Sequence, residues 1–244
     1  MSTILQAEGI KKAFGGIQAL NGASIAVEEG EIHGLIGPNG SGKTTLFNVI
    51  TGYAQADAGQ VVFRGQQIGL YRPGRIMSLG IGRTFQLTRI FSRLTVLENM
   101  FVPSRDGFGK TLFGGWASHA DRQRAMELLN LVGIAKLAHL HAGNLSYGQR
   151  KLLEIATVMM LEPEVILLDE PAGGVNPTMI GHIRNRIEEL NRNGVTFLIV
   201  EHNMGFVMEL CDHVTVMHRG QTLDSGTPDK VRKNEAVLDA YLGD

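Results

Sequence analysis

The chain is built around one segment of nine residues, Gly37-Pro38-Asn39-Gly40-Ser41-Gly42-Lys43-Thr44-Thr45. This segment matches the phosphate-loop pattern G-x-x-x-x-G-K-[ST] in full. Its glycines permit a tight curve and let backbone N–H groups approach phosphate oxygens, where a Cβ would intrude. We expect Lys43 to reach the β- and γ-phosphates and the Thr44 hydroxyl to ligate Mg²⁺. All nine residues are therefore predicted to hold the phosphates of a nucleotide.

The residues on either side of this segment give it the context that such a loop requires. Residues 31–36 are predicted to form a short strand, and residues 45–50 a helix. The positive N-terminal end of that helix would face the bound anion. A glycine-rich turn without a ligand is the alternative, and the strand–loop–helix order favours the nucleotide site.

The composition is that of an ordinary globular protein. Of 244 residues, 43% are hydrophobic and 19% are charged, and the net charge is −1. Without a basic run, nucleic acid is not expected to be the principal ligand. No apolar run approaches the ~18–20 residues of a membrane helix, and no secretory signal is visible, so we expect a cytoplasmic protein that meets membranes through a partner. The single cysteine, Cys211, excludes an internal disulfide and is expected to be a buried thiol.

The periodicity along the chain predicts an α/β fold. Residues 3–10, 23–28 and 61–64 alternate as half-buried strands do, which indicates an antiparallel sheet beside the nucleotide core. Residues 73–160 have helical character, with a capping box at Thr95 and an amphipathic helix over 119–132. After Pro163 we expect buried strands at 165–168, 195–200 and 214–217, a shorter strand at 221–224, and helices at 177–192 and after Thr227-Pro228.

Two further segments carry candidate chemistry. Asp169 and Glu170 follow the apolar strand 165–168, where Asp169 could hold Mg²⁺ and Glu170 could polarise the attacking water. Leu145-Ser146-Tyr147-Gly148-Gln149 precedes a helix that Ser146 would cap, leaving N–H groups able to bind a second anion. An ordinary capped helix is the alternative. The glycine-rich stretch from Pro103 to Trp116 is either a mobile loop or a surface that faces a partner or membrane.

In the order of these motifs, the chain resembles the ATP-binding cassette (ABC) ATPases along essentially its whole length. Phe14 matches the aromatic residue that stacks on adenine, and Gln86 the glutamine that touches Mg²⁺ and water and reports to the transporter. Leu145–Gln149 matches the signature motif, Val165–Glu170 the Walker B strand with its catalytic glutamate, and His202 the switch histidine. The resemblance implies a P-loop NTPase of the ABC fold, with one domain over 1–244 and a helical subdomain inserted at about 87–160.

The same resemblance implies a role for each site residue. Glu170, His202, Gln86 and Lys43 would be catalytic, and Thr44, Gln86 and Asp169 would hold Mg²⁺. ATP would lie between Phe14, the phosphate loop and the Ser146, Tyr147, Gly148 and Gln149 of a second ABC ATPase subunit, identical or related. Integral-membrane permease subunits would be the other partners, which would place this protein on the cytoplasmic face of the cell membrane.

Within the ABC ATPases, the chain is similar to the ATP-binding subunits of branched-chain amino-acid transporters. The evidence is Phe14-Gly15-Gly16, Arg83-Thr84-Phe85-Gln86, the segment Asp169–Pro177 and the ending Ala240-Tyr241-Leu242-Gly243. Tyr147 replaces the first signature glycine, and Asn176 stands where most members have aspartate; both are usual in this group. Lipopolysaccharide-export ATPases and soluble ABC ATPases of cytoplasmic assembly machines are the alternatives. A binding protein and permease outside this chain would select the transported solute.

Overall fold

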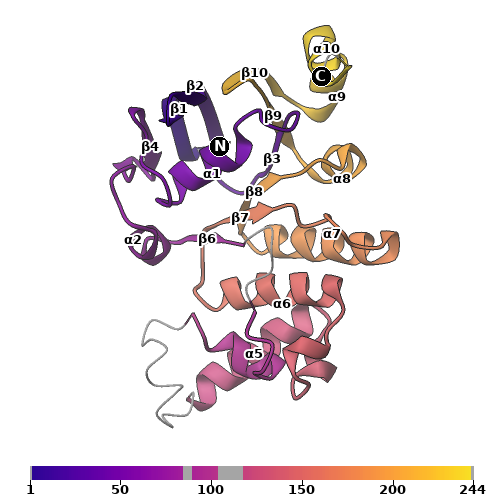
Figure 1. The fold of residues 1–244 in the computed structure, drawn as a ribbon. Helices are drawn as coiled ribbons and strands as arrows, with labels where there is room; N and C mark the ends of the chain where they lie inside the picture. The colour runs from indigo at the N-terminus through magenta and orange to yellow at the C-terminus, as the bar shows by residue number, and fades with distance from the viewer. Residues whose placement is uncertain (1, 85–89, 104–117, 243–244) are drawn as a thin grey trace.

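A computed structural model describes residues 2–84, 90–103 and 118–242, and its core is a six-stranded sheet (Figure 1). The strand order of this core sheet is β10-β9-β3-β8-β7-β6. All neighbours pair in parallel except β10 and β9. The strands are β3 (Ile32–Ile36), β6 (Ile81–Arg83), β7 (Val165–Asp169), β8 (Thr196–Val200), β9 (His213–His218) and β10 (Gln221–Gly226).

The core strands are hydrophobic because both of their faces are covered. Every residue of β3, β7 and β8 is buried, as expected for parallel strands between two layers. Successive side chains alternate between two hydrophobic clusters, because the side-chain period of a strand is two. In β7, Ile166 and Leu168 belong to the cluster that includes α6 and α7, whereas Val165 and Leu167 belong to the cluster that includes α1 and the antiparallel sheet.

The antiparallel sheet predicted from the N-terminal third is present, with longer strands than expected. Its order is β2-β1-β4-β5, built from β1 (Thr3–Phe14), β2 (Ile17–Glu28), β4 (Ala58–Phe63) and β5 (Gln66–Gln67). The β1–β2 hairpin turns at Gly15-Gly16, where both glycines have positive φ. The sequence pattern underestimated the lengths of β1 and β2, because bulges in their pairing break the strict alternation of apolar and polar residues.

The helices cover the core sheet and form a lower layer (Figure 1). They are α1 (Lys43–Ile50), α2 (Pro73–Ser78), α3 (Val96–Met100), α5 (His119–Leu131), α6 (Tyr147–Met159), α7 (Pro177–Arg192), α8 (Met204–Leu210), α9 (Pro228–Arg232) and α10 (Glu235–Leu242), with 3₁₀ turns at Ala135–Leu137 and Ala142–Asn144. The predicted capping box at Thr95 is present, and α7 begins at Pro177 as expected. Within the described ranges, we find no helix whose length and apolar character would suffice to span a membrane.

One core element was not predicted. The expected helical region from residue 73 contains β6, which pairs with β7 at the edge of the core sheet. Its three residues, Ile-Gly-Arg, are too few to show a period of two. The central Gly82 is required by packing, since a Cβ there would lie 2.4 Å from Cγ1 of Val158 on α6.

Cys211 is buried, as predicted, directly after α8. Its Sγ lies 3.1 Å from the position that a Cβ on Gly34 of β3 would occupy, so the thiol fills the space beside that glycine. Burial raises the pKa of the Cys211 thiol far above its ordinary value, and the nearby charges of Asp212 and Glu201 act in the same direction. The thiol is therefore held in its neutral form.

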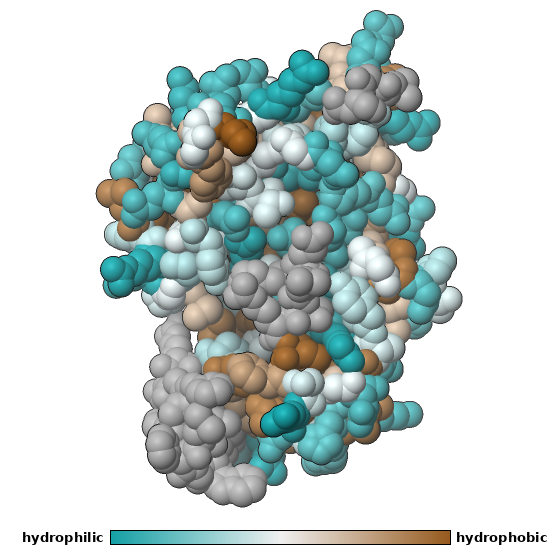
Figure 2. Space-filling view, viewed as in Figure 1, coloured by the Kyte–Doolittle hydropathy of each residue, from teal (hydrophilic) through white to brown (hydrophobic). Residues whose placement is uncertain are grey.

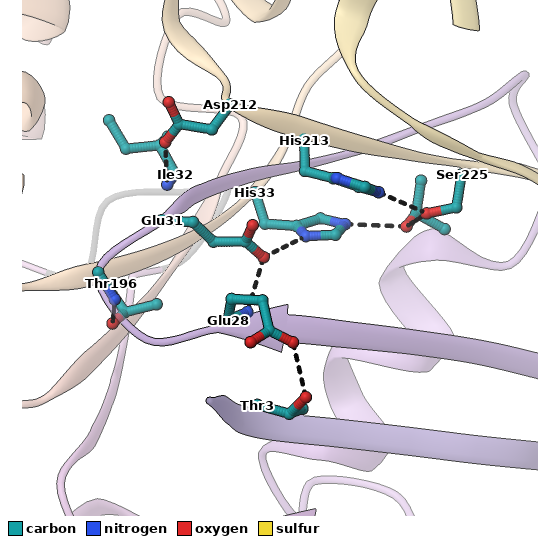
Figure 3. Close-up of polar contacts among 11 residues, drawn as sticks. Thr3, Glu28, Glu31, Ile32, His33, Thr196, Asp212, His213 and Ser225 are labelled. Atoms are coloured by element: carbon teal, nitrogen blue, oxygen red, sulfur yellow. Dashed lines mark hydrogen bonds and ion pairs between the residues drawn. The ribbon is translucent and has the colours of Figure 1, made fainter. Parts of the chain in front are cut away.

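A buried polar network ties the start of the core sheet to the antiparallel sheet (Figure 3). His33 of β3 lies with Nδ1 2.8 Å from Glu31 Oε1 and with Nε2 2.8 Å from the Thr215 hydroxyl of β9. Glu31 also accepts a hydrogen bond from the backbone N–H of Glu28, at the end of β2. The ring of His213 lies 5.2 Å from that of His33. Both imidazoles therefore sit in one cluster at the junction of the two sheets.

This cluster predicts a loss of stability on acidification. Burial lowers the pKa of His213, and the neighbouring His33 and Lys230 lower it further against the opposing carboxylates of Glu31 and Glu28. A histidine whose pKa is lowered on folding favours the folded state above its ordinary pKa, about 6.5, and that contribution is lost as pH falls through this value. Burial alone would raise the pKa of Glu31, but the hydrogen bonds from His33 and Glu28 outweigh it and hold that pKa below 4.5, so a second loss follows at lower pH.

We therefore expect the midpoint of thermal unfolding to fall between about pH 7.5 and about pH 5.5, and His213→Gln to reduce that fall. His119→Gln is the matched control, because His119 is exposed on α5. Differential scanning calorimetry at both pH values measures the effect. Equal pH dependence in the two variants would contradict the assignment to His213.

Candidate nucleotide-binding site

The phosphate loop joins β3 to α1 and is wedged between two backbone segments. A Cβ on Gly37, whose φ is 147°, would lie 2.1 Å from the carbonyl oxygen of Met217 on β9. A Cβ on Gly42, with φ 101°, would lie 2.7 Å from the carbonyl oxygen of Ala19 on β2. Only glycine fits either position, so these two residues fix the path of the loop.

Lys43 folds back across this loop. Its ammonium donates hydrogen bonds to the carbonyl oxygens of Gly37, at 2.7 Å, and Pro38, at 2.8 Å. Burial lowers the pKa of Lys43, and the negative charges of Glu170 and Asp169 oppose that shift. The structure thus brings the predicted loop lysine and the predicted carboxylates into one electrostatic environment, although they are far apart in the sequence.

Asp169 ends β7 and is buried beside a cation. Its Oδ2 lies 3.4 Å from Nη2 of Arg83 on β6. The same guanidinium donates to Asn48 Oδ1 at 2.8 Å and to the Thr51 hydroxyl at 2.7 Å, at the far end of α1. Burial raises the pKa of Asp169, and the charge and hydrogen bond of Arg83 oppose that rise. Arg83 therefore links the phosphate-loop helix to the carboxylate, a role that the sequence pattern did not indicate.

Glu170 adopts a left-handed backbone conformation, with φ 50°, directly after β7. Its Oε1 lies 2.7 Å from Nε2 of His202, which follows β8. These two predicted catalytic residues are therefore in direct contact. A non-glycine residue with positive φ carries local strain that the surrounding structure must support.

Glu201 supplies much of that support. One of its carboxylate oxygens accepts from the backbone N–H of Ala172, at 2.6 Å, and the other from the N–H groups of His202 and Asn203, at 3.0 and 3.2 Å. Burial raises the pKa of Glu201, and these hydrogen bonds oppose the rise. Glu201 thus holds the segments that carry Glu170 and His202 together. Sequence analysis assigned no role to Glu201.

The signature segment lies on the other side of the core sheet. Ser146 caps α6, with its hydroxyl accepting from the N–H of Gln149 and its own N–H donating to Gln149 Oε1, so the predicted cap is confirmed. The buried side chains of α6 and α1 belong to opposite hydrophobic clusters. The structure therefore does not bring Ser146–Gln149 onto the face of the sheet that carries α1.

The other predicted site residues occupy separate positions. Phe14 ends β1 with its side chain 51% exposed, and Lys12 Nζ lies 5.4 Å from the centre of its ring. Thr44 is exposed in the first turn of α1. Gln86 lies outside the described residues, as does most of the stretch from Pro103 to Trp116.

Tyr241 on α10 is a further residue at the phosphate loop, and it comes from the far end of the chain. Burial raises the pKa of Tyr241 to about 12, against the opposing effect of a hydrogen bond with the backbone of Gly37. The C-terminal helix therefore reaches the first residue of the phosphate loop. No sequence motif indicated this contact, because it depends on how the chain folds back.

Comparison with known proteins identifies the class to which this fold and site belong. The ABC transporter family matches residues 20–173. A second family, described as branched-chain amino acid ATP-binding cassette transporter, matches residues 225–244. The chain belongs to the ABC transporter family, and it is an ATP-hydrolysing subunit of that family.

Full-length relatives narrow the class further. The chain is 40% identical to the probable branched-chain amino acid transport ATP-binding protein LivG of Archaeoglobus fulgidus, covering 98% of this chain and 95% of that protein. It is 39% identical to the high-affinity protein BraF of Pseudomonas aeruginosa, covering 99% and 98%. Its structure is similar to that of a nucleotide-free ATP-binding cassette from an ABC transporter, with a TM-score of 0.91, 37% identity and full coverage of both chains.

Proposed function

We propose that this protein hydrolyses ATP to energise the import of branched-chain or related hydrophobic amino acids through a separate membrane permease. The observation that carries this proposal is the full-length similarity to branched-chain amino acid transport ATP-binding proteins, including the C-terminal match at residues 225–244. Export of lipopolysaccharide and service to a soluble assembly machine are the alternative functions, and neither has a comparable observation in its favour.

In the proposed site, each residue of this chain has a separate role. Glu170, held by His202, would accept the proton of the attacking water, and Lys43 would leave its loop carbonyls to contact the β- and γ-phosphates. Phe14 would stack on adenine. The phosphates would lie against the N–H groups of residues 37–45 at the start of α1.

The donor set fits a magnesium ion. Mg²⁺ prefers oxygen ligands, and it would neutralise charge that develops on the transferred phosphate. The exposed Thr44 hydroxyl and the carboxylate of Asp169 are oxygen donors from two elements of the same site. We propose these two residues, with Gln86, as the magnesium ligands.

Two such subunits, identical or related, would share each ATP, with Ser146, Tyr147, Gly148 and Gln149 of one facing the phosphate loop of the other. This arrangement agrees with the position of α6 on the opposite face of the sheet from α1. We propose that residues 1–244 form one nucleotide-binding domain, and that the helical subdomain at about 87–160 faces the permease on the cytoplasmic side of the cell membrane.

The surface of the lower layer supports that orientation. Hydrophobic side chains gather in the lower half of the face shown in Figure 2, whereas hydrophilic ones predominate above. Phe91, with its side chain 42% exposed, precedes α3 in this layer. Its backbone is held in place by Asn99, which accepts from the Phe91 N–H at 2.8 Å and donates to its carbonyl at 3.1 Å. An apolar side chain on a rigid support is suited to receive a short permease helix.

Affinity purification from membranes, combined with uptake of labelled leucine, tests the proposed function. The protein should co-purify with a permease, and ATP-dependent uptake should require it. Phe91→Ala should lower both permease association and uptake several-fold without changing the thermal stability of the isolated subunit. Leu70→Ala is the matched control, because Leu70 is an 82% exposed apolar residue in the loop between β5 and α2, away from the lower layer.

Each other outcome favours a different function. Recovery with soluble scaffold proteins and no permease would support the assembly-machine ATPase. Co-purification with lipopolysaccharide-export components, without leucine uptake, would support the exporter. A large loss of stability in Phe91→Ala, with permease association retained, would mean that Phe91 only packs the junction between subdomains.

A further inference from the structure

The start of α6 is docked on the start of α7 of the same chain through a glycine. Gly148 is buried, and a Cβ there would lie 2.3 Å from Met179 Cγ and 3.3 Å from Val175 Cγ1. A larger residue could occupy this position only if Met179 or the helix itself moved. The first turn of α6 therefore packs closely against the side chains of Met179 and Val175.

Tyr147 makes a second connection beside this glycine. Its Cε1 lies 3.4 Å from the position that a Cβ on Gly174 would occupy, so the ring lies beside that glycine. The Lys151 ammonium, one turn along α6, lies 5.6 Å from the centre of the same ring. The residue as a whole is 38% exposed. A large aromatic residue at the start of α6 thus covers a glycine in the segment after β7.

The covered segment is the turn that holds Glu170. We call residues 170–174 the Glu170 turn. Gly173 donates from its N–H to the Glu170 carbonyl at 3.1 Å, and Gly174 has a positive φ of 69°. Two adjacent glycines give this turn more conformational freedom than any other pair of residues would. Glu201 holds the turn at Ala172, and the ring of Tyr147 lies beside Gly174 at its other end.

We propose that Tyr147 is a positioning residue, whose ring on Gly174 holds the Glu170 turn against α6 so that movement of the signature helix is transmitted to the catalytic carboxylate. This inference rests on the proposed function, in which α6 meets the ATP of the partner subunit. Binding of that ATP at Ser146–Gln149 of one chain would then adjust Glu170 in the same chain, which faces the other ATP. The two sites of a dimer would be coupled through one aromatic contact in each subunit.

The first test compares Tyr147→Ala with Tyr147→Phe. Tyr147→Ala should lower kcat for ATP hydrolysis on the order of ten- to a hundredfold, because a small displacement of a catalytic group has effects of that size. Its KM for ATP should change by a much smaller factor than kcat, and the Hill coefficient for ATP should fall toward one. Tyr147→Phe should restore most of kcat and the cooperativity, since it keeps the ring.

A dimerisation assay separates positioning from direct contact with nucleotide. When combined with Glu170→Gln, Tyr147→Ala should shift the ATP concentration needed for dimerisation, measured by light scattering, by a much smaller factor than it lowers kcat, because Tyr147 also faces the partner's phosphate loop. If it loses the dimer together with kcat, Tyr147 acts on the partner's nucleotide and the positioning role is wrong. A parent protein that neither hydrolyses ATP nor dimerises with it would contradict the proposed function. Failure of this inference is recognised differently, by the behaviour of the variants alone.

A glycine pair provides an independent test should Tyr147→Ala fold poorly. Gly174→Ala would bring a Cβ against the tyrosine ring at positive φ, whereas Gly194→Ala, with φ 95° and open space around it, introduces backbone strain alone. Gly174→Ala should lower kcat several-fold more than Gly194→Ala at equal loss of thermal stability. Equal kcat in the two variants would overturn the proposal.

Discussion

Replacing Glu170 with glutamine should lower the rate of ATP hydrolysis by about 10²–10⁴-fold while leaving ATP binding intact. The contribution of a general base corresponds to roughly 3–5 kcal/mol of activation free energy. Glutamine has nearly the same shape, so it can still meet His202, which lies 2.7 Å from Glu170 Oε1, but it cannot accept the proton of water. Phosphate release measures turnover, isothermal titration measures binding, and light scattering should detect an ATP-bound dimer that accumulates.

Glu162→Gln is the matched control for this variant. Glu162 is an exposed glutamate with φ 51°, almost the backbone conformation of Glu170, and it lies at the other end of β7. Its replacement should leave both turnover and binding unchanged. Turnover in Glu170→Gln within a few-fold of the parent would show that another group activates the water.

Replacing Arg83 with methionine should destabilise the folded protein by about 3–5 kcal/mol, because it removes one partner of a buried ion pair. The Arg83 side chain is 8% exposed, and it connects Asp169 to Asn48 and Thr51. Without its charge, the pKa of Asp169 should rise further above its ordinary value. A higher pKa means that Asp169 becomes protonated at higher pH, so the acid limb of the rate profile should move toward neutral pH.

Chemical denaturation and the pH dependence of kcat together check this prediction. Arg75→Met is the matched control. Arg75 lies on α2 with its guanidinium over the ring of Tyr71, and no carboxylate contact of the Arg75 side chain was found in the described part of the chain. Arg83→Lys should recover part of the stability, because lysine restores the positive charge but lacks the planar guanidinium with its paired N–H donors. An unchanged acid limb in a folded Arg83→Met protein would show that Asp169 does not depend on this cation.

The sequence predicted most of the core because its local patterns coincide with the tertiary environment. The apolar runs at 165–168 and 195–200 indicated strands buried on both faces, and β7 and β8 occupy those positions. The capping box at Thr95 and the cap at Ser146 placed helix starts, since the hydrogen bonds that form them are local. The resemblance assigned catalytic roles to Glu170 and His202, but their direct contact at 2.7 Å was not predicted.

What sequence analysis missed depends on contacts between distant segments. Arg83 reaches Asp169 across 86 positions, and its role appears only when β6 pairs with β7. Glu201 resembles any acid at the end of a strand until its three backbone donors are known. The contact of Tyr241 with Gly37 joins the two most distant parts of the site. No local period or motif encodes such pairings.

The neutral, enclosed thiol beside Gly34 makes this protein ready for spectroscopic labelling. Maleimides and spin labels react with exposed thiolates, and burial suppresses that form at Cys211. A cysteine introduced at an exposed position of α5 or α7 would therefore carry the only label, with no need to remove the native one. Distances between the labels of two subunits could then follow the closing and opening of the proposed ATP-bound pair directly, in the otherwise unaltered chain.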